Sequence, residues 1–243
     1  MTAIQTYDLC RSFGKVCAVD HLNLSVNTGE IYALLGVNGA GKTTTIRMLS
    51  CLLRPDGGDA QLLGHSILQE SEEIKKHINL SPQETAVARN LSVRENLLLI
   101  ARIYGLSKAD ASARTQELLD ALHLQEVARR KAGTLSGGYQ RRLSIAMALV
   151  SRPKILFLDE PTLGLDVLAR RALWTFISSL RGEMTIILTT HSMEEAEALS
   201  DRIGILSAGK LCACGTAAEL ITRANADTFE NAFIALVSGE ASK

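Results

Sequence analysis

Between Gly36 and Thr43 the chain has the spacing G-x-x-x-x-G-K-T, which brings together residue types that bind phosphate. The glycines let backbone N–H groups point at phosphate oxygens, Lys42 can reach the outer phosphates, and Thr43 offers a hydroxyl to Mg²⁺. An apolar run at 31–35 precedes this loop and a segment of helical character at 44–49 follows it. A helix that begins there adds the positive end of its dipole. The context predicts a nucleotide phosphate site rather than a glycine turn that binds nothing.

Two carboxylates at the end of a second apolar run are suited to hydrolysis. The run 155–158 leads directly into Asp159 and Glu160. In a parallel sheet the carboxyl ends of the strands meet ligands at one edge. We expect Asp159 to serve Mg²⁺, through water, and Glu160 to act as the general base that orients the attacking water. An apolar run ending in Asp-Glu is by itself also a common strand-to-turn transition, and the upstream phosphate loop favours the catalytic interpretation.

Two further segments begin helices where a phosphate could approach. His191 ends the apolar run 186–190, and the next four residues, 192–195, have the pattern of a capping box. An imidazole at that sheet edge can donate a hydrogen bond to phosphate or water, the alternative being a structural histidine. In the segment 135–140, Ser136 is expected to cap a helix and two glycines allow close backbone approach. An ordinary capped helix is the alternative there.

The elements that position these residues follow from hydrophobic periodicity. The first thirty residues alternate as strands do. Between about 88 and 150 strand signals give way to helical ones, including a capping box at 92–95, which predicts an inserted helical subdomain. Apolar runs typical of strands return at 155–158, 186–188 and 203–206. Their alternation with helical segments predicts a parallel sheet, and the length of 243 residues suits one such domain, 1–243.

Composition narrows the function classes. Lys+Arg and Asp+Glu number 26 each and aromatics make up 4%, so neither charge nor stacking surface points to a nucleic-acid partner. No apolar run approaches 18 residues and no secretion signal is recognised, which predicts a cytosolic chain. The five cysteines are scattered. Cys212 and Cys214 would share one face of a strand, where a metal or redox role and ordinary buried thiols are the alternatives.

Taken in order, these motifs resemble the nucleotide-binding subunit of ATP-binding cassette (ABC) transporters. The residues that carry the resemblance are Gly36 to Thr43, Gln83, Leu135 to Gln140, Leu158-Asp159-Glu160-Pro161, Gly164-Leu165-Asp166 and His191. It covers essentially the whole chain, and the LSGG sequence just before the Asp-Glu strand is highly specific to this family. The resemblance implies an α/β fold: a P-loop NTPase core with a mainly parallel sheet, an N-terminal antiparallel β subdomain and the inserted helical subdomain.

The resemblance also implies roles for single residues toward ATP and Mg²⁺. Two subunits are expected to close head to tail around two ATP molecules, so that Ser136 and Gly138 contact the γ-phosphate held by the other subunit. Gln83 would touch Mg²⁺ and the attacking water, and Asp166 would link the two sites. Phe13 would stack on adenine, with Val19 beside the sugar.

The expected nucleotide-binding set is Phe13, Val19, Asn38, Gly39, Ala40, Gly41, Lys42, Thr43, Thr44, Ser136 and Gly138. The expected metal ligands are Thr43, Gln83 and Asp159, and the expected catalytic residues are Glu160, His191 and Gln83. Tyr139 stands where many members carry Gln, and Phe13 replaces the more usual Tyr, so both positions could tune nucleotide affinity.

Two segments resemble exporter subunits. The residues at 88–96, just after Gln83, resemble the region that docks a membrane protein, and 227–236 is similar to the C-terminal tail of the drug, polysaccharide and sodium exporter branch. A helical tail is expected over about 216–243, with a short amphipathic surface helix as the alternative. These resemblances imply an export ATPase that forms a homodimer on ATP binding and serves an integral membrane permease at the cytoplasmic face of the plasma (inner) membrane.

The competing class is a soluble ABC ATPase that acts on ribosomes, DNA or iron–sulfur assembly. Ribosomal members usually carry two cassettes with a basic linker, and DNA-acting members carry long coiled coils. The sequence has neither feature. A degenerate, regulatory cassette is disfavoured because Lys42, Asp159, Glu160 and His191 are all intact.

Overall fold

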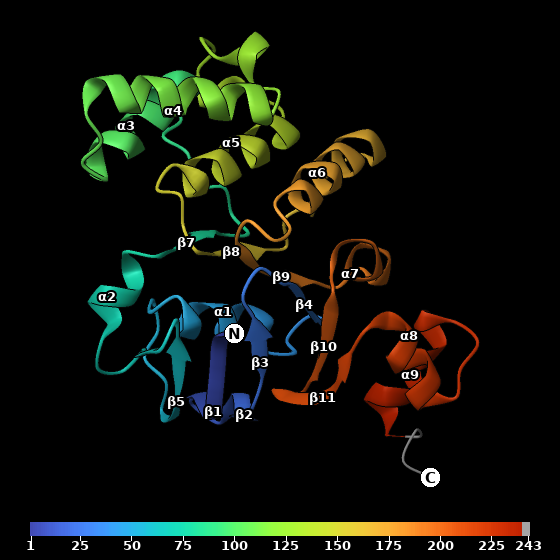
Figure 1. The fold of residues 1–243 in the computed structure, drawn as a ribbon. Helices are drawn as coiled ribbons and strands as arrows, with labels where there is room; N and C mark the ends of the chain where they lie inside the picture. The colour runs from blue at the N-terminus through green and yellow to red at the C-terminus, as the bar shows by residue number, and fades with distance from the viewer. Residues whose placement is uncertain (240–243) are drawn as a thin grey trace.

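The computed structural model describes residues 1–239, which fold around two β-sheets (Figure 1). The larger sheet has the strand order β11-β10-β4-β9-β8-β7, parallel throughout except for the antiparallel β10–β11 pair. Its strands are β4 (Ile31–Leu35), β7 (Ile78–Ser81), β8 (Ile155–Asp159), β9 (Thr185–Thr190), β10 (Arg202–Ser207) and β11 (Lys210–Gly215). The mainly parallel sheet predicted from the sequence is therefore confirmed.

The central strands are largely apolar because both of their faces are covered. Every residue of β4, β8 and β9 is buried. Along β4, Ile31, Ala33 and Leu35 belong to one hydrophobic core, whereas Tyr32 and Leu34 belong to the other. This alternation is what a strand with period two requires when helices or a second sheet lie on each side.

The smaller sheet is antiparallel, with the order β2-β1-β5-β6 and with β3 paired to β1. Its strands are β1 (Thr2–Phe13), β2 (Val16–Leu22), β3 (Ser25–Asn27), β5 (Gly57–Leu62) and β6 (His65–Ser66). One hydrophobic core joins this sheet to helix α1 (Lys42–Leu49) and to one face of the larger sheet. The expected N-terminal antiparallel β subdomain is confirmed, and it extends to residue 66.

Three long helices lie together beyond the β7–β8 edge of the larger sheet (Figure 1). They are α3 (Val93–Ile103), α4 (Lys108–Ala121) and α5 (Gly137–Leu149), with 3₁₀ turns at Gln125–Val127 and Ala132–Thr134. The capping box at Ser92 and Glu95 starts α3, as its sequence predicts, and Ser107 caps α4. These helices contribute Leu97, Leu119 and Leu143 to the core on the second face of the sheet.

Four further helices complete the cover of that face: α6 (Val167–Ser179), α7 (Met193–Leu199), α8 (Ala217–Ala224) and α9 (Phe229–Ser238). The short helix α2 (Ser71–Lys75) contributes Ile74 to the other core, together with α1. Helices α8 and α9 form the C-terminal tail and lie beside β10 and β11 (Figure 1). The last four positions of the expected tail, 240–243, lie outside the described residues. Among residues 1–239, none of the helices combines the length and apolar character needed to cross a bilayer.

Candidate functional site

The loop between β4 and α1 is shaped by close backbone approaches. Gly41, which precedes the first turn of α1, has φ 101°, and a Cβ there would lie 2.3 Å from the carbonyl oxygen of Ala18. Only glycine fits this position. The start of α1 receives no side-chain cap, so its first amides remain available to an anion. The Nζ of the buried Lys42 donates to the carbonyl oxygens of Gly36 and Val37 at 2.7 and 3.2 Å.

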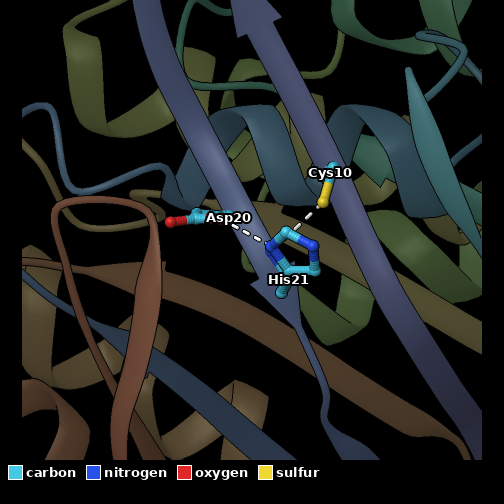
Figure 2. Close-up of side chains that lie close together, drawn as sticks. All are labelled: Cys10, Asp20 and His21. Atoms are coloured by element: carbon cyan, nitrogen blue, oxygen red, sulfur yellow. Dashed lines mark hydrogen bonds and ion pairs between the residues drawn. The ribbon is translucent and has the colours of Figure 1, made fainter.

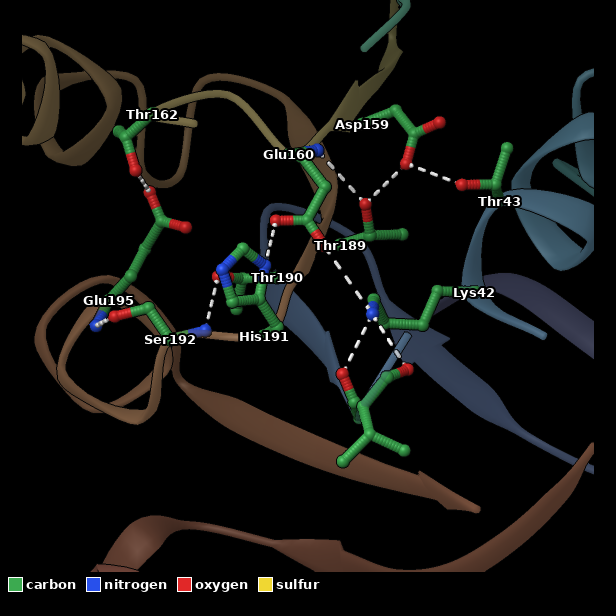
Figure 3. A network of polar contacts seen from close by, with 12 residues as sticks. Lys42, Thr43, Asp159, Glu160, Thr162, Thr189, Thr190, His191, Ser192 and Glu195 are labelled. Carbon is green, nitrogen blue, oxygen red and sulfur yellow. Dashed lines mark hydrogen bonds and ion pairs between the residues drawn. The ribbon is translucent and has the colours of Figure 1, made fainter. Parts of the chain in front are cut away.

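The end of β8 brings Asp159 against two hydroxyls (Figure 3). Thr43 Oγ1 donates to Asp159 Oδ1 at 3.1 Å, and Thr189 Oγ1 donates to the same oxygen at 2.5 Å. Thr43 is the second residue of α1, whereas Thr189 lies on β9, the strand next to β8. The adjacent hydroxyl and carboxylate oxygens are hard donors of the type that Mg²⁺ prefers.

Glu160 lies between a cation and an imidazole (Figure 3). Its Oε1 is 3.4 Å from Lys42 Nζ and its Oε2 is 2.8 Å from His191 Nδ1. The backbone N–H of Glu160 donates to both the Oγ1 and the carbonyl oxygen of Thr189, at 3.0 and 3.2 Å. Because Glu160 is 6% exposed, its carboxylate is held by these contacts rather than by bulk water.

A cavity of about 580 Å³ opens over the loop and the carboxylates. Its lining residues are Val16, Ala18, Asn38, Gly39, Ala40, Gly41, Lys42, Thr43, Thr44, Gln83, Glu160, Leu163 and His191. The structure therefore brings together the phosphate loop, Gln83, Glu160 and His191, which lie far apart in the sequence. Asp159 does not itself line the cavity, but it is hydrogen-bonded to Thr43, which does.

The two residues expected at the adenine and the sugar, Phe13 and Val19, differ in their exposure to solvent. Phe13 is half exposed at the end of β1, with the Arg11 guanidinium 5.0 Å from its ring. Val19 is fully buried in the core and does not line the cavity, which is lined instead by Val16 and Ala18 of the same strand. The resemblance named neither of those two positions, and the β1–β2 register shifts on both sides of the pair formed by Arg11 and Val19.

Ser136 and Gly138 lie at the start of α5 and do not line the cavity of their own chain. The expectation that Ser136 caps α5 through its hydroxyl is wrong, because its side chain accepts no hydrogen bond from the helix. The residue is exposed, so its hydroxyl can meet a group outside this chain.

The capping box expected after His191 forms only in part. Ser192 accepts a hydrogen bond from the N–H of Glu195 at 3.3 Å, but the Glu195 side chain does not return it. Its Oε1 instead accepts from Thr162 Oγ1 at 2.7 Å and from Trp174 Nε1 at 3.1 Å. The helix after His191 is thereby bonded to the loop that follows Glu160 (Figure 3).

A separate cluster of potential ligands lies on the β1–β2 ribbon (Figure 2). The donor atoms of Cys10, Asp20 and His21 all lie within 4.8 Å of one another. Asp20 is paired with His21 Nδ1 at 2.7 Å and with Lys210 Nζ at 3.1 Å, and these partners lower the pKa of its carboxyl group. The cluster is therefore a polar network whose charge is balanced within the chain.

The cysteines of β11 have protein partners. Cys214 Sγ lies 3.3 Å from the Tyr32 hydroxyl and accepts from Arg202 at 3.1 Å. Burial, followed by the proximity of Cys214, raises the pKa of Tyr32 well above its ordinary value. Among the hydrogen bonds of residues 1–239, Cys212 makes only a long one, 3.9 Å, to the carbonyl oxygen of Lys210. These contacts favour the reading of ordinary, partly buried thiols.

Comparison with known proteins agrees with this geometry. Residues 19–163 match the family model described as ABC transporter. The chain is 45% identical to the doxorubicin resistance ATP-binding protein DrrA of Mycobacterium tuberculosis, over 89% of this chain and 65% of that protein. It is 39% identical to the linearmycin resistance ATP-binding protein LnrL of Bacillus subtilis, over 93% of this chain and 73% of that protein. A dimeric ATP-binding cassette in a post-hydrolysis state, bound to ADP and Pi, superposes with a TM-score of 0.80 at 25% identity, covering 88% of this chain and 98% of that one.

Proposed function

This chain belongs to the ABC transporter family, and from that premise we propose that it is the ATP-hydrolysing subunit of an exporter that dimerises around two ATP molecules. The observation that carries the proposal is the position of Glu160, between Lys42 and His191 at the cavity formed by the phosphate loop. A carboxylate there lies where the outer phosphate and its attacking water would meet.

The nucleotide would enter with its phosphates on the loop. The uncapped amides of α1 and the glycine-rich backbone fit phosphate oxygens, and Lys42 exchanges its carbonyl acceptors for them. Phe13 is exposed for stacking on adenine, and Val16 and Ala18 offer apolar surface beside the sugar. Mg²⁺, when bound, would neutralise phosphate charge, and the oxygens of Thr43, Asp159 and Gln83 fit a hard cation.

The chemistry assigned to this chain is proton removal and charge stabilisation. Glu160 accepts a proton from the attacking water, and Gln83 orients that water. His191 donates a hydrogen bond to the γ-phosphate while its contact with Glu160 fixes the ring. Ser136 and Gly138 of a second copy close the site from the other side, which makes hydrolysis depend on dimerisation.

A membrane partner is supported by an apolar groove beside Gln83. The groove has a volume of about 480 Å³ and is lined by Ser50, Leu52, Lys75, Ile78, Asn79, Leu80, Pro82, Ala86 and Tyr104. Leu52 is 60% exposed and Tyr104 is 44% exposed. Exposure of this apolar surface to water is unfavourable, and a bound apolar segment would cover it. A short helix of a permease fits this groove, and a partner seated there would touch the loop that carries Gln83.

The relatives' names associate them with resistance to doxorubicin and linearmycin. They support a permease that exports drug-like small molecules, at the cytoplasmic face of the plasma (inner) membrane. The alternative of a soluble cassette ATPase draws no support from the groove or from these relatives.

The test is purification of the chain from its own cells in mild detergent, with identification of whatever co-purifies in stoichiometric amount. We expect a multi-spanning membrane protein, lost in Leu52→Asp but retained in Ile234→Asp, a matched change at an exposed position of α9. Ribosomal, nucleic-acid or iron–sulfur assembly partners would contradict the exporter.

A further inference from the structure

Arg141 is a buried cation whose acceptors are backbone carbonyls. It lies in the second turn of α5 and is 5% exposed. Its Nη1 donates to the carbonyl oxygen of Pro82 at 2.7 Å, and its Nη2 donates to the carbonyl oxygen of Gln83. Burial lowers the pKa of the guanidinium, while Asp159 and Glu160 oppose that effect from farther away. Arginine nevertheless remains charged in proteins.

Two neighbouring contacts attach the same loop to α5. Ser144, one turn after Arg141, places its Oγ 2.9 Å from Ser81 Oγ, with both side chains buried. Gln140 accepts a hydrogen bond from Thr85 Oγ1 at 3.4 Å. The loop that begins at the end of β7 is thus held at both sides of Gln83 by one face of one helix.

In the proposed dimer, Gln83 and the start of α5 contact two different nucleotides. Gln83 lines the cavity of its own chain, whereas the start of α5 carries Ser136 and Gly138, which do not. We propose that Arg141 is a positioning residue that fixes Gln83 to α5, so that closure on the partner's ATP moves Gln83 into its catalytic place. This inference rests on the proposed function.

The chemistry of the link requires arginine. Its planar fork donates to two consecutive carbonyls at once, whereas a lysine ammonium on a flexible stem fixes no such pair. Two charge-assisted hydrogen bonds inside the protein resist separation of the loop from the helix. Breaking them would leave a buried charge and two carbonyl oxygens without hydrogen-bond partners. The loop and α5 therefore move together.

The first experiment measures amide hydrogen exchange in the hydrolysis-blocked Glu160→Gln chain, with and without Mg-ATP. We expect Mg-ATP to slow exchange in both segments, 36–44 and 82–87. With Mg-ATP bound, adding Arg141→Gln should raise the exchange rate of 82–87 about fivefold, while 36–44 stays protected. Arg141→Lys should fall between the two. Arg114→Gln is the matched control, because that arginine donates to the Leu149 carbonyl at the far end of α5 and should leave 82–87 protected.

The second experiment is a double-mutant cycle on kcat in the full chain. Arg141→Gln should lower kcat about tenfold with less than about a twofold change in KM, because it disturbs a group that acts in the chemical step. In a Gln83→Ala background the same change should have no further effect.

The outcomes separate the two claims. Loss of ATP protection at 36–44 in the Glu160→Gln chain would overturn the proposed function, and with it this inference. Protection at 36–44 with unchanged protection at 82–87 in Arg141→Gln would overturn the role of Arg141 alone. Additive losses in the cycle would likewise assign Arg141 a structural role independent of Gln83.

Discussion

Replacing Thr189 by valine tests whether the hydroxyl on β9 holds the catalytic carboxylates in place. Thr189 is fully buried, donates to Asp159 Oδ1 at 2.5 Å and accepts from the Glu160 N–H at 3.0 Å. Valine keeps the shape and removes both bonds. The bond to a charged group is worth about 1.5–3 kcal/mol. The Glu160 N–H still donates to the Thr189 carbonyl oxygen at 3.2 Å, so loss of its bond to the hydroxyl costs less free energy.

We therefore expect Thr189→Val to lower the free energy of unfolding by about 2 kcal/mol. For a domain of this size, that corresponds to a fall in Tm of about 4–8 °C. Thr185→Val on the same strand is the matched control. Thr185 is also buried, and its Oγ1 accepts only a neutral bond from the Gly29 N–H at 3.0 Å. Its loss should cost about 1 kcal/mol.

The assay is calorimetric unfolding of the three proteins without nucleotide, followed by the Mg²⁺ dependence of ATP hydrolysis. Thr189→Val should unfold at a lower temperature than Thr185→Val. It should also need more Mg²⁺, because within the described part of the chain Asp159 then retains only Thr43 as a hydroxyl partner. Equal Tm values for the two variants, together with an unchanged Mg²⁺ requirement, would refute the reasoning.

Three further predictions address the site and a thiol. Lys42→Ala should lose at least about tenfold in ATP affinity because a charge-assisted phosphate contact disappears, and tight binding in an equilibrium titration would contradict the loop assignment. His191→Ala should lower kcat by about 10²-fold while ATP affinity changes little, so a loss confined to KM would count against it. Burial raises the pKa of the Cys51 thiol, so less thiolate forms at a given pH and alkylation at pH 8 should be slower than at the exposed Cys17. Equal rates by peptide mass spectrometry would contradict that expectation.

The loop, the sheet and several helix starts could be predicted because their signals are local. The G-x-x-x-x-G-K-T spacing encodes the turn and the helix that follows, and fully apolar runs encode strands covered on both faces. The capping box at Ser92 and Glu95 is likewise contained in four residues.

What the sequence did not predict depends on register or on contacts across the fold. Alternation alone does not say whether Val19 or its neighbours face the cavity, because bulges in the β1–β2 pair reset the period of two. Ser136 has the residue type of a helix cap, yet its side chain makes no such bond. The bonds from Arg141 to the loop at Gln83 join segments far apart in the sequence, which periodicity cannot pair.

The central claim is that two copies of this chain dimerise around ATP and that Glu160, by enabling hydrolysis of that ATP, allows the dimer to come apart. The most direct measurement is the solution mass of the Glu160→Gln chain by light scattering, with Mg-ATP and with Mg-ADP. The account predicts a stable dimer with Mg-ATP and a monomer with Mg-ADP, because ATP is bound but not cleaved. A Glu160→Gln chain that remains monomeric with saturating Mg-ATP would contradict it.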